Sequence, residues 1–336
     1  MKTASRNSCI DTIKGFACIA VVLIHYNWGN DLSTVLQVIG RFAVPFFFFV
    51  AGFYLPDHNS NITSERTFQK TKHIGNILLK SVLFYTPFCI FWNLAMDPSW
   101  NILSFSQDKI TIDSVIKILL SSDPVVYSHL WYLLASFSCY LLLFLIGKYL
   151  NQSICIFLFL VLSLLYISFA ELRAISGFDN YYPLPGGKTL VISNLFLLRA
   201  LPFVMYGIFL RKKETMHCRL PFIFLLIICL LGFICAVIEH FHYGTVLVYI
   251  GTLIAHNYPG KKIAIMEYIG SRLSMYVYIY HIAVGKIMDL IYTKLHLWGK
   301  SPFKFWRPIL VLLGSFAVAQ LIVFFKRKQQ FKKSCN

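Results

Sequence analysis

The sequence predicts an all-α fold, a polytopic bundle of transmembrane helices. Of the 336 residues, 57% are hydrophobic and 13% are charged, whereas an average soluble domain carries about 25% charged residues. Apolar runs also follow one another almost from end to end of the chain. A bilayer admits helices or closed barrels, and the alternating strands of a barrel are not visible in this sequence. We therefore expect residues 1–336 to form a single helical membrane domain.

The apolar runs define roughly ten predicted spans, since a helix needs about 20 residues to cross the hydrocarbon core. The first run follows a basic N-terminus, but no small-residue cleavage site comes after it, which predicts an uncleaved span rather than a signal peptide. The eighth run is short and ends in His256-Asn257-Tyr258-Pro259-Gly260, so we expect a tilted or partly re-entrant segment there. In chain order, the predicted spans are 12–28, 35–55, 74–96, 127–147, 153–171, 189–210, 220–238, 243–258, 264–285 and 307–325.

The basic residues predict the orientation, because short cytoplasmic loops of membrane proteins are enriched in Lys and Arg. The chain has 31 of these residues against 14 Asp and Glu, a formal net charge of +17. With the N-terminus inside, most basic clusters fall on the cytoplasmic side, and only the loop 286–307 goes against the rule. We therefore expect both termini in the cytoplasm. In a soluble protein this charge would indicate nucleic acid, but here it predicts contact with anionic lipids and no nucleic-acid partner.

Metal sites and the usual motifs of soluble enzymes are not visible in the sequence. The nine Cys show neither CxxC nor Cys/His metal spacing. Ser/His/Asp sets, Gly-rich phosphate loops, paired carboxylates and HExxH are likewise missing. The sequence thus predicts no metal and no resident cofactor. Candidate sites are expected among polar residues inside the spans, where a charge is costly and by default marks a function.

Lys14 and His25 form the sharpest candidate pair. They are eleven residues apart in the first span, which on an α-helix is roughly 16 Å along the axis and about 20° around it. Both are therefore expected on one helix face, Lys14 at the cytoplasmic mouth and His25 deeper in the membrane. A Lys ammonium can hold a phosphate, and an imidazole can accept a hydroxyl proton. The alternative is that Lys14 is a topological anchor and His25 a structural histidine bonded to a neighbouring helix.

A longer pattern of residues surrounds this pair. It reads Asp11-x-x-Lys14-Gly15-x-Ala17, then His25, then an aromatic run from Arg41 to Phe53 that ends in a small residue and Gly. This pattern resembles the opening of the acyltransferase type 3 family of integral-membrane acyltransferases, which includes bacterial polysaccharide O-acetyltransferases. The resemblance continues along nearly the whole chain, with His129-Leu130-Trp131-Tyr132-Leu133, Arg199-Ala200-Leu201-Pro202-Phe203 leading to Gly207, and Ile269-Gly270-x-x-x-Ser274 leading to Tyr278 and His281.

The resemblance implies roles for the first of these residues. His25 would be the catalytic base, Lys14 a donor-binding residue, and Asp11 would orient the start of the helix. Family members commonly carry an Arg-x-x-Arg pair where this chain has Lys70-x-Lys72-His73. Positive charge is kept there, but the bidentate fork of Arg is lost. Lys70, Lys72 and His73 therefore form either a phosphate-binding segment with shifted detail or an ordinary cytoplasmic basic loop.

Two arginines are further candidates on the acceptor side. Arg199 lies inside an apolar run, where an Arg costs at least about 2.5–3.5 kcal/mol, so it needs a carboxylate, a carbonyl or an anionic ligand. We expect either a site role or a structural ion pair, with Glu239 as the candidate partner. Arg41 lies at the outer edge of the second span and is either a site residue or one that snorkels to the interface.

Aromatic residues and histidines complete the set of candidates. His129, Trp131 and Tyr132 open the fourth span at the outer surface, where interfacial anchoring is the default and stacking on a sugar ring is the alternative. His281 follows three tyrosines at alternating positions, which cannot share one helix face, and it is a secondary candidate on the acceptor side. Three more histidines rank below it: His240, His242 and His256.

Together with the resemblance, these residues predict a multi-pass enzyme of the cell membrane, in the first instance a bacterial cytoplasmic membrane. It would transfer an acyl group, acetyl above all, from cytoplasmic acyl-CoA to a hydroxyl of a glycan or lipid-linked saccharide. His25 would remove the hydroxyl proton or relay the acyl group. The predicted partners are acyl-CoA, the saccharide and membrane lipids. The rival is a saccharide or lipid-precursor transporter with Lys14, His25 and Arg199 along its pathway, although paired broken helices in two matching halves are lacking.

Overall fold

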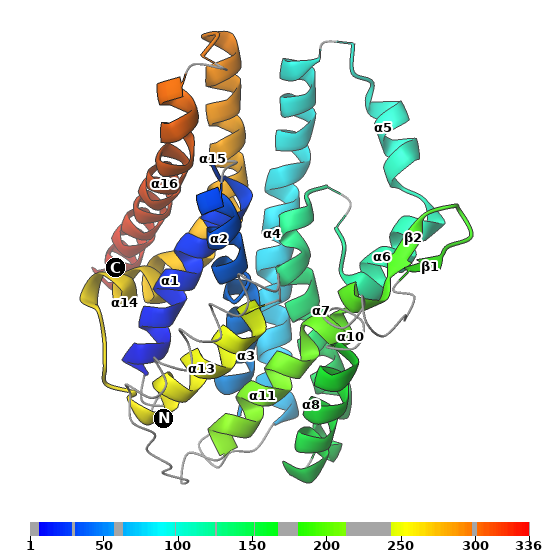
Figure 1. Ribbon diagram of the computed structural model, residues 1–336, viewed down its shortest axis with the longest axis vertical. Coiled ribbons are helices and arrows are strands. Elements are labelled where there is room, and N and C mark those ends of the chain that lie inside the picture. The colour runs from blue at the N-terminus through cyan, green and yellow to red at the C-terminus, as the bar shows by residue number, and fades with distance from the viewer. Residues whose placement is uncertain are drawn as a thin grey trace. The chain divides into compact units, whose positions relative to one another are not determined.

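The structure is a computed structural model of the chain and describes residues 7–28, 31–56, 63–97, 99–124, 126–150, 152–166, 181–212, 243–297 and 301–335. These residues are mainly helical, which confirms the all-α prediction, and they include a short antiparallel hairpin (Figure 1). The chain divides into two compact units, unit 1 with residues 1–46 and 217–336 and unit 2 with residues 47–216. The division falls inside helix α3 (Ala43–Phe53).

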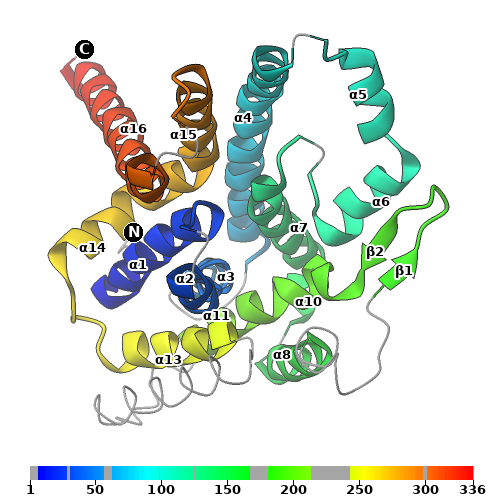
Figure 2. The same cartoon turned by 45° about the horizontal axis from the view of Figure 1, so that its top comes forward.

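Unit 1 brings the N-terminal helices together with helices from the end of the chain. In Figures 1 and 2 the first helix lies beside the golden and orange helices of the C-terminal part. The elements of unit 1 are α1 (Ser8–His25), α2 (Asp31–Gly40), the start of α3, α13 (Tyr243–Asn257), α14 (Ala264–Tyr268), the π-helical turn η5 (Ile269–Leu273), α15 (Ser274–Lys294) and α16 (Ser301–Cys335).

Both ends of α1 are fixed by neighbouring residues. At its start, the Asn7 side chain accepts a hydrogen bond from the Ile10 N–H at 2.9 Å, a usual cap for a helix N-terminus. The Asn7 amide in turn donates to the carbonyl of Ala255 at 2.9 Å, which ties the cap to α13. At its end, Tyr26 takes an extended conformation, so that His25 is the last helical residue. The helix therefore starts and ends earlier than the predicted span 12–28.

Two glycines allow α1 to cross the segment between α14 and α15 at backbone contact. A Cβ atom at Gly270 would lie on the carbonyl oxygen of Asp11, and one at Gly15 would lie on that of Met266. Small residues at membrane helix interfaces are typical of such close approaches. The crossing lies at η5, where the Ser274 hydroxyl donates to the Gly270 carbonyl at 2.8 Å. This bond gives a structural reason for the spacing Gly270-x-x-x-Ser274.

Unit 2 contains the middle of the chain, and its longest helix, α4, packs along α7 (Figure 1). Its elements are the end of α3, α4 (Ser64–Met96), α5 (Ile102–Lys109), α6 (Ile112–Ser121), η1 (Ser128–Leu130), α7 (Trp131–Ile146), η2 (Gly147–Tyr149), α8 (Gln152–Tyr166), β1 (Tyr181–Pro183), β2 (Thr189–Val191), η4 (Ile192–Asn194), α10 (Phe196–Arg199) and α11 (Leu201–Lys212). Strands β1 and β2 pair with Tyr182 opposite Leu190.

Glycines also set the contact between α3 and α11. A Cβ at Gly52 would lie on the carbonyl oxygen of Val204, and one at Gly207 on that of Phe49. Phe49 is buried there against Tyr206, with the ring centroids 5.6 Å apart. Gly52, at the end of the aromatic run, and Gly207, after the Arg199 motif, therefore lie on the two sides of one helix contact.

Five helices of the described residues are long and apolar enough to cross a membrane: Ser8–His25, Ser33–Phe53 (α2 and α3 together), Ser64–Met96, Ser128–Ile146 and Phe305–Gln330. Two shorter apolar helices, Ser153–Tyr166 and Leu247–Asn257, fall on the predicted spans 153–171 and 243–258. The predicted span 220–238 lies outside the described residues. The count of ten spans and the cytoplasmic placement of the termini stay predictions.

The predicted span 189–210 is wrong as a single helix. Its first residues form strand β2, and its helical part is broken at Ala200 between α10 and α11. Pro202 explains the break, because it has no N–H and its ring would clash with the carbonyl of Leu198 in a continuous helix. Pro45 divides the predicted span 35–55 in the same way, at the turn around Arg41.

The strand replaces a helix because the hairpin turn is held by a buried carboxylate. Asp113 on α6 is fully buried and accepts hydrogen bonds from the backbone N–H groups of Gly186 at 2.9 Å and Lys188 at 3.1 Å. The Lys188 ammonium donates to the hydroxyls of Thr111 and Ser114 at the start of the same helix, each at 3.1 Å. These bonds fasten the hairpin to α6.

Candidate active site

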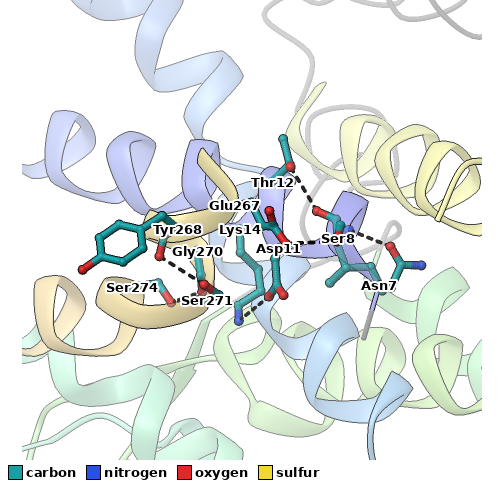
Figure 3. A network of polar contacts seen from close by, with 11 residues as sticks. Asn7, Ser8, Asp11, Thr12, Lys14, Glu267, Tyr268, Gly270, Ser271 and Ser274 are labelled. Carbon is teal, nitrogen blue, oxygen red and sulfur yellow. Dashed lines mark hydrogen bonds and ion pairs between the residues drawn. The ribbon is translucent and has the colours of Figure 1, made fainter. Parts of the chain in front are cut away.

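Lys14 and Asp11 form an ion pair on α1 at its crossing with η5. The Lys14 ammonium lies 3.3 Å from Asp11 Oδ1, and 19% of the Lys14 side chain is exposed against 7% of that of Asp11. Figure 3 shows the pair beside Gly270 and Ser271. Asp11 thus positions Lys14 and offsets the cost of burying its charge. Lys14 remains accessible enough to meet an anionic ligand.

A second set of polar contacts fixes the same end of α1. The Ser8 hydroxyl donates to Glu267 on α14 at 3.0 Å, and the Lys262 ammonium lies 3.3 Å from the other oxygen of that carboxylate. The Thr12 hydroxyl accepts from the N–H of Ile263 at 3.2 Å. Figure 3 shows Ser8, Thr12 and Glu267 close together where α1 meets α14. These contacts give Lys14 a rigid, polar support that comes from two distant parts of the sequence.

His25, at the other end of α1, lies next to His281 of α15. The two ring centroids are 5.2 Å apart with the planes tilted by 41°. His25 is exposed, whereas His281 is fully buried. The structure therefore brings together two histidines that the sequence analysis proposed as separate candidates.

Backbone carbonyls set the tautomer of His281. Its Nδ1 lies 2.8 Å from the carbonyl oxygen of Tyr278 and 3.1 Å from that of Val277. A carbonyl only accepts, so Nδ1 carries the proton, and in the neutral ring Nε2 is left as the acceptor. The two bonds to α15 carbonyls thereby fix the orientation of the His281 ring beside His25.

The residue after His25 locks the end of α1 onto α15. A Cβ at Gly285 would lie on the Tyr26 ring, and the Tyr26 hydroxyl donates to the carbonyl of Ile282 at 3.3 Å. The Arg307 guanidinium covers the same ring at 5.0 Å and makes a bidentate pair with Asp289 at 2.8 and 3.1 Å. This support for His25 was not predicted from the sequence. The signal was Gly285, one helical turn after His281.

The predicted basic segment lies near the start of α4, where its members point to different faces. Lys70 and Lys72 are two residues apart, which is about 200° on a helix, so they do not converge on one ligand. Lys70 shares its face with His73 and with Arg66, which the sequence analysis did not propose for this site. The guanidinium of Arg66 donates to the carbonyl of Tyr54 at 3.1 Å. Lys70 is half-buried, while Lys72 and His73 are exposed.

His129 and Tyr132 lie in the aromatic core of unit 2. His129 is buried and packs edge-on against Tyr85, with centroids 4.8 Å apart, and near Tyr127 at 6.0 Å. Tyr132 is buried with its ring 4.8 Å from that of Phe48. These contacts support a structural role for both residues.

Arg199 finds its partners within unit 2. Its guanidinium stacks on the Trp131 ring at 3.6 Å, donates to the carbonyl of Ser121 at 3.0 Å and to the side chain of Asn194 at 3.3 Å. The proposed partner Glu239 lies outside the described residues, as do His240 and His242. A carbonyl and an amide thus meet the requirement that a membrane Arg be bonded. Arg199 covers one face of the Trp131 ring, so a sugar cannot stack on that face.

The predicted candidates thus separate into groups. In unit 1, Asp11, Lys14, His25 and His281 gather where α1 meets η5 and α15, while Arg41 is exposed at the turn between α2 and α3. In unit 2, Trp131 and Arg199 lie together. No cluster of His, Cys, Asp or Glu suited to a metal is found among the described residues. The first group places a cation, Lys14, and an imidazole, His25, on one helix.

Comparison with known proteins identifies the family of the chain. The search of curated proteins and the search of solved structures gave no match. The model of the acyltransferase type 3 family, described as an acyltransferase domain, matches residues 7–326. That stretch begins at the cap of α1 and ends within α16, so it includes every candidate residue above. The chain therefore belongs to the acyltransferase type 3 family and is a membrane acyltransferase.

Proposed function

We propose that this acyltransferase moves an acetyl group from cytoplasmic acetyl-CoA to a hydroxyl of a glycan or lipid-linked saccharide at a bacterial cytoplasmic membrane, with His25 as the general base. The observation that carries the proposal is the His25–His281 pair. An accessible imidazole beside a buried one of fixed tautomer is suited to proton transfer. A structural histidine would need neither the exposure nor the second ring.

The chemical step is an acyl transfer in which His25 moves one proton. His25 removes the proton of the acceptor hydroxyl while the oxygen attacks the thioester carbonyl. The ester C–O bond forms, the C–S bond breaks, and the leaving CoA thiolate takes the proton from His25. General acid–base help of this kind contributes typically about 10²–10⁴-fold.

Lys14 binds the donor in this proposal. It lies roughly 16 Å along α1 from His25 on nearly the same face, so it can hold a phosphate group of CoA away from the reacting thioester. Asp11 keeps the ammonium in place. Lys70, Lys72 and His73 belong to unit 2, and their role in phosphate binding stays a prediction from the sequence.

The test compares His25→Gln with wild-type protein in lipid vesicles. The substrates are labelled acetyl-CoA and total glycan and glycolipid from cells that lack the protein, and the readouts are free CoA and labelled saccharide. We expect His25→Gln to lose at least about 100-fold of the transfer rate. His296→Gln changes an exposed histidine just after α15 that was never a candidate, and as the matched control it should keep wild-type activity.

Two results would contradict the proposal. One is a His25→Gln protein that retains more than about a tenth of the transfer rate, because the loss of a general base costs at least about 10²-fold. The other is wild-type protein that carries saccharide across the vesicle membrane without releasing CoA, which would support a transporter instead.

A further inference from the structure

Unit 2 contains a polar cavity that the proposed proton transfer does not use. It has a volume of ≈ 170 Å³ and lies among α6, the start of α7, β2, η4 and α10. Figure 2 shows β2 running beside α6. Two cations and one carboxylate line the cavity, and four further side chains contribute hydroxyls or an amide: Lys117, Arg199, Asp123, Ser121, Ser128, Thr189 and Asn194.

Arg199 is held in one orientation before any ligand arrives. Its guanidinium stacks on Trp131 at 3.6 Å, and its hydrogen bonds to Ser121 and Asn194 fix the plane of the fork. A planar, pre-oriented guanidinium loses little entropy when it binds an oxyanion. Arg199 is thus a ready anion-binding group on one wall of the cavity.

A second wall of the cavity is fixed as well. Thr189 and its neighbours in β2 belong to the hairpin whose turn is fastened to α6 by Asp113. The Lys188 ammonium adds bonds to Thr111 and Ser114 on the same helix. Both walls of the cavity are therefore tied to α6, which also carries Lys117, and the cavity keeps its shape without a ligand.

The volume of the cavity and the side chains that line it indicate the kind of ligand. The volume lies below the about 300–1,000 Å³ of pockets for drug-sized ligands, so it suits one monosaccharide unit rather than a longer chain. Two cations against one carboxylate favour an anion. The hydroxyl and amide groups suit a polyhydroxylated molecule and not an acyl chain.

We infer that this cavity binds an anionic sugar whose carboxylate or phosphate lies between Lys117 and Arg199. Asp123, Ser128 and Asn194 would bond its hydroxyls. The inference rests on the proposed function, because it names the acceptor class as an acidic glycan. The acceptor would then be selected by charge in unit 2.

The test measures binding of glucuronic acid, glucose 6-phosphate and glucose to the full-length protein in nanodiscs of zwitterionic lipid, without acetyl-CoA. We expect the two anionic sugars to bind at least about tenfold more tightly than glucose. The tighter of the two identifies carboxylate or phosphate as the natural group. Raising the salt concentration should weaken the binding of the two anionic sugars and leave the binding of glucose unchanged.

Variants that remove the charge of Lys117 or of Asp123 should change the affinity for anionic sugars in opposite directions. Lys117→Gln should weaken the binding of both anionic sugars about tenfold, while Lys117→Arg should preserve it. Asp123→Asn keeps a hydrogen-bonding side chain and removes a negative charge, so the anions should bind more tightly. Lys109→Gln removes an exposed cation of α5 that does not line the cavity, and it should change nothing.

Equal binding of glucose and the anionic sugars would overturn the inference, and so would Lys117→Gln with wild-type affinity in a protein that unfolds at the wild-type temperature. These results leave the proposed function intact if labelled acetyl still reaches a neutral glycan. Conversely, anion binding with the predicted variant effects and no release of CoA would contradict the proposed function and still support the cavity as a site for an anionic sugar.

Discussion

At the scale of residues, Lys14 and His25 owe their chemistry to what α1 places beside them. Helical periodicity predicts from the sequence that the two share a face, and α1 is continuous from Ser8 to His25. The ion pair with Asp11 is three residues away and was also within reach of sequence reasoning. The neighbour His281 was not, because contact between residues at opposite ends of a chain depends on how α1 and α15 pack.

Lys14→Ala should raise the KM for acetyl-CoA about tenfold or more, since a charge-assisted contact to phosphate is lost. The kcat should stay within a few-fold, and Lys14→Arg should keep wild-type kinetics. The difference between wild type and Lys14→Ala should shrink for acetyl-pantetheine, a donor without phosphates. Steady-state kinetics in vesicles measure all of these, with Lys261→Ala, an exposed cation of unit 1, as control. An unchanged KM for acetyl-CoA would exclude Lys14 from the donor site.

At the scale of elements, prolines and glycines explain where helices break and where they touch. Pro45 and Pro202 lie where the predicted spans 35–55 and 189–210 divide, and both breaks could be predicted from the sequence. The hairpin could not, because it depends on Asp113 reaching backbone groups more than seventy residues away. Glycine contacts are also invisible in one sequence until the helices are placed.

Gly270→Ala should lower the stability of the protein, because its Cβ would lie on the Asp11 carbonyl and force α1 away from η5. Overpacking of this kind costs typically about 1–3 kcal/mol. A lower thermal unfolding temperature in detergent, together with a raised KM for acetyl-CoA through displacement of Lys14, is the expected result. Gly260→Ala is the control, since the described residues leave open space around that position. If both variants unfold at the wild-type temperature, α1 and η5 do not make this contact.

At the scale of the whole molecule, the candidate site needs both ends of the chain. α1 supplies Lys14 and His25, while the last helices supply Gly270, His281 and the Arg307–Asp289 pair. The family match over residues 7–326 has the same extent. Hydropathy predicted the class of fold because a bilayer leaves few alternatives to helices. The span count needs the side of each loop, which basic residues indicate only as an excess.

Cysteine labelling checks the predicted topology. In a chain whose natural cysteines are replaced, a single Cys at position 332 should react with a membrane-impermeant maleimide only after the membrane is opened, because the basic tail is expected in the cytoplasm. A Cys in place of Asp97, in a loop expected on the outer face, should react in intact cells and serves as the matched position. Five helices of the described residues meet the length and hydropathy of a span, and an odd total would place the two termini on opposite sides. Labelling of position 332 from outside, at the rate seen for position 97, would therefore refute the cytoplasmic C-terminus, and together with a cytoplasmic N-terminus it would require an odd span count.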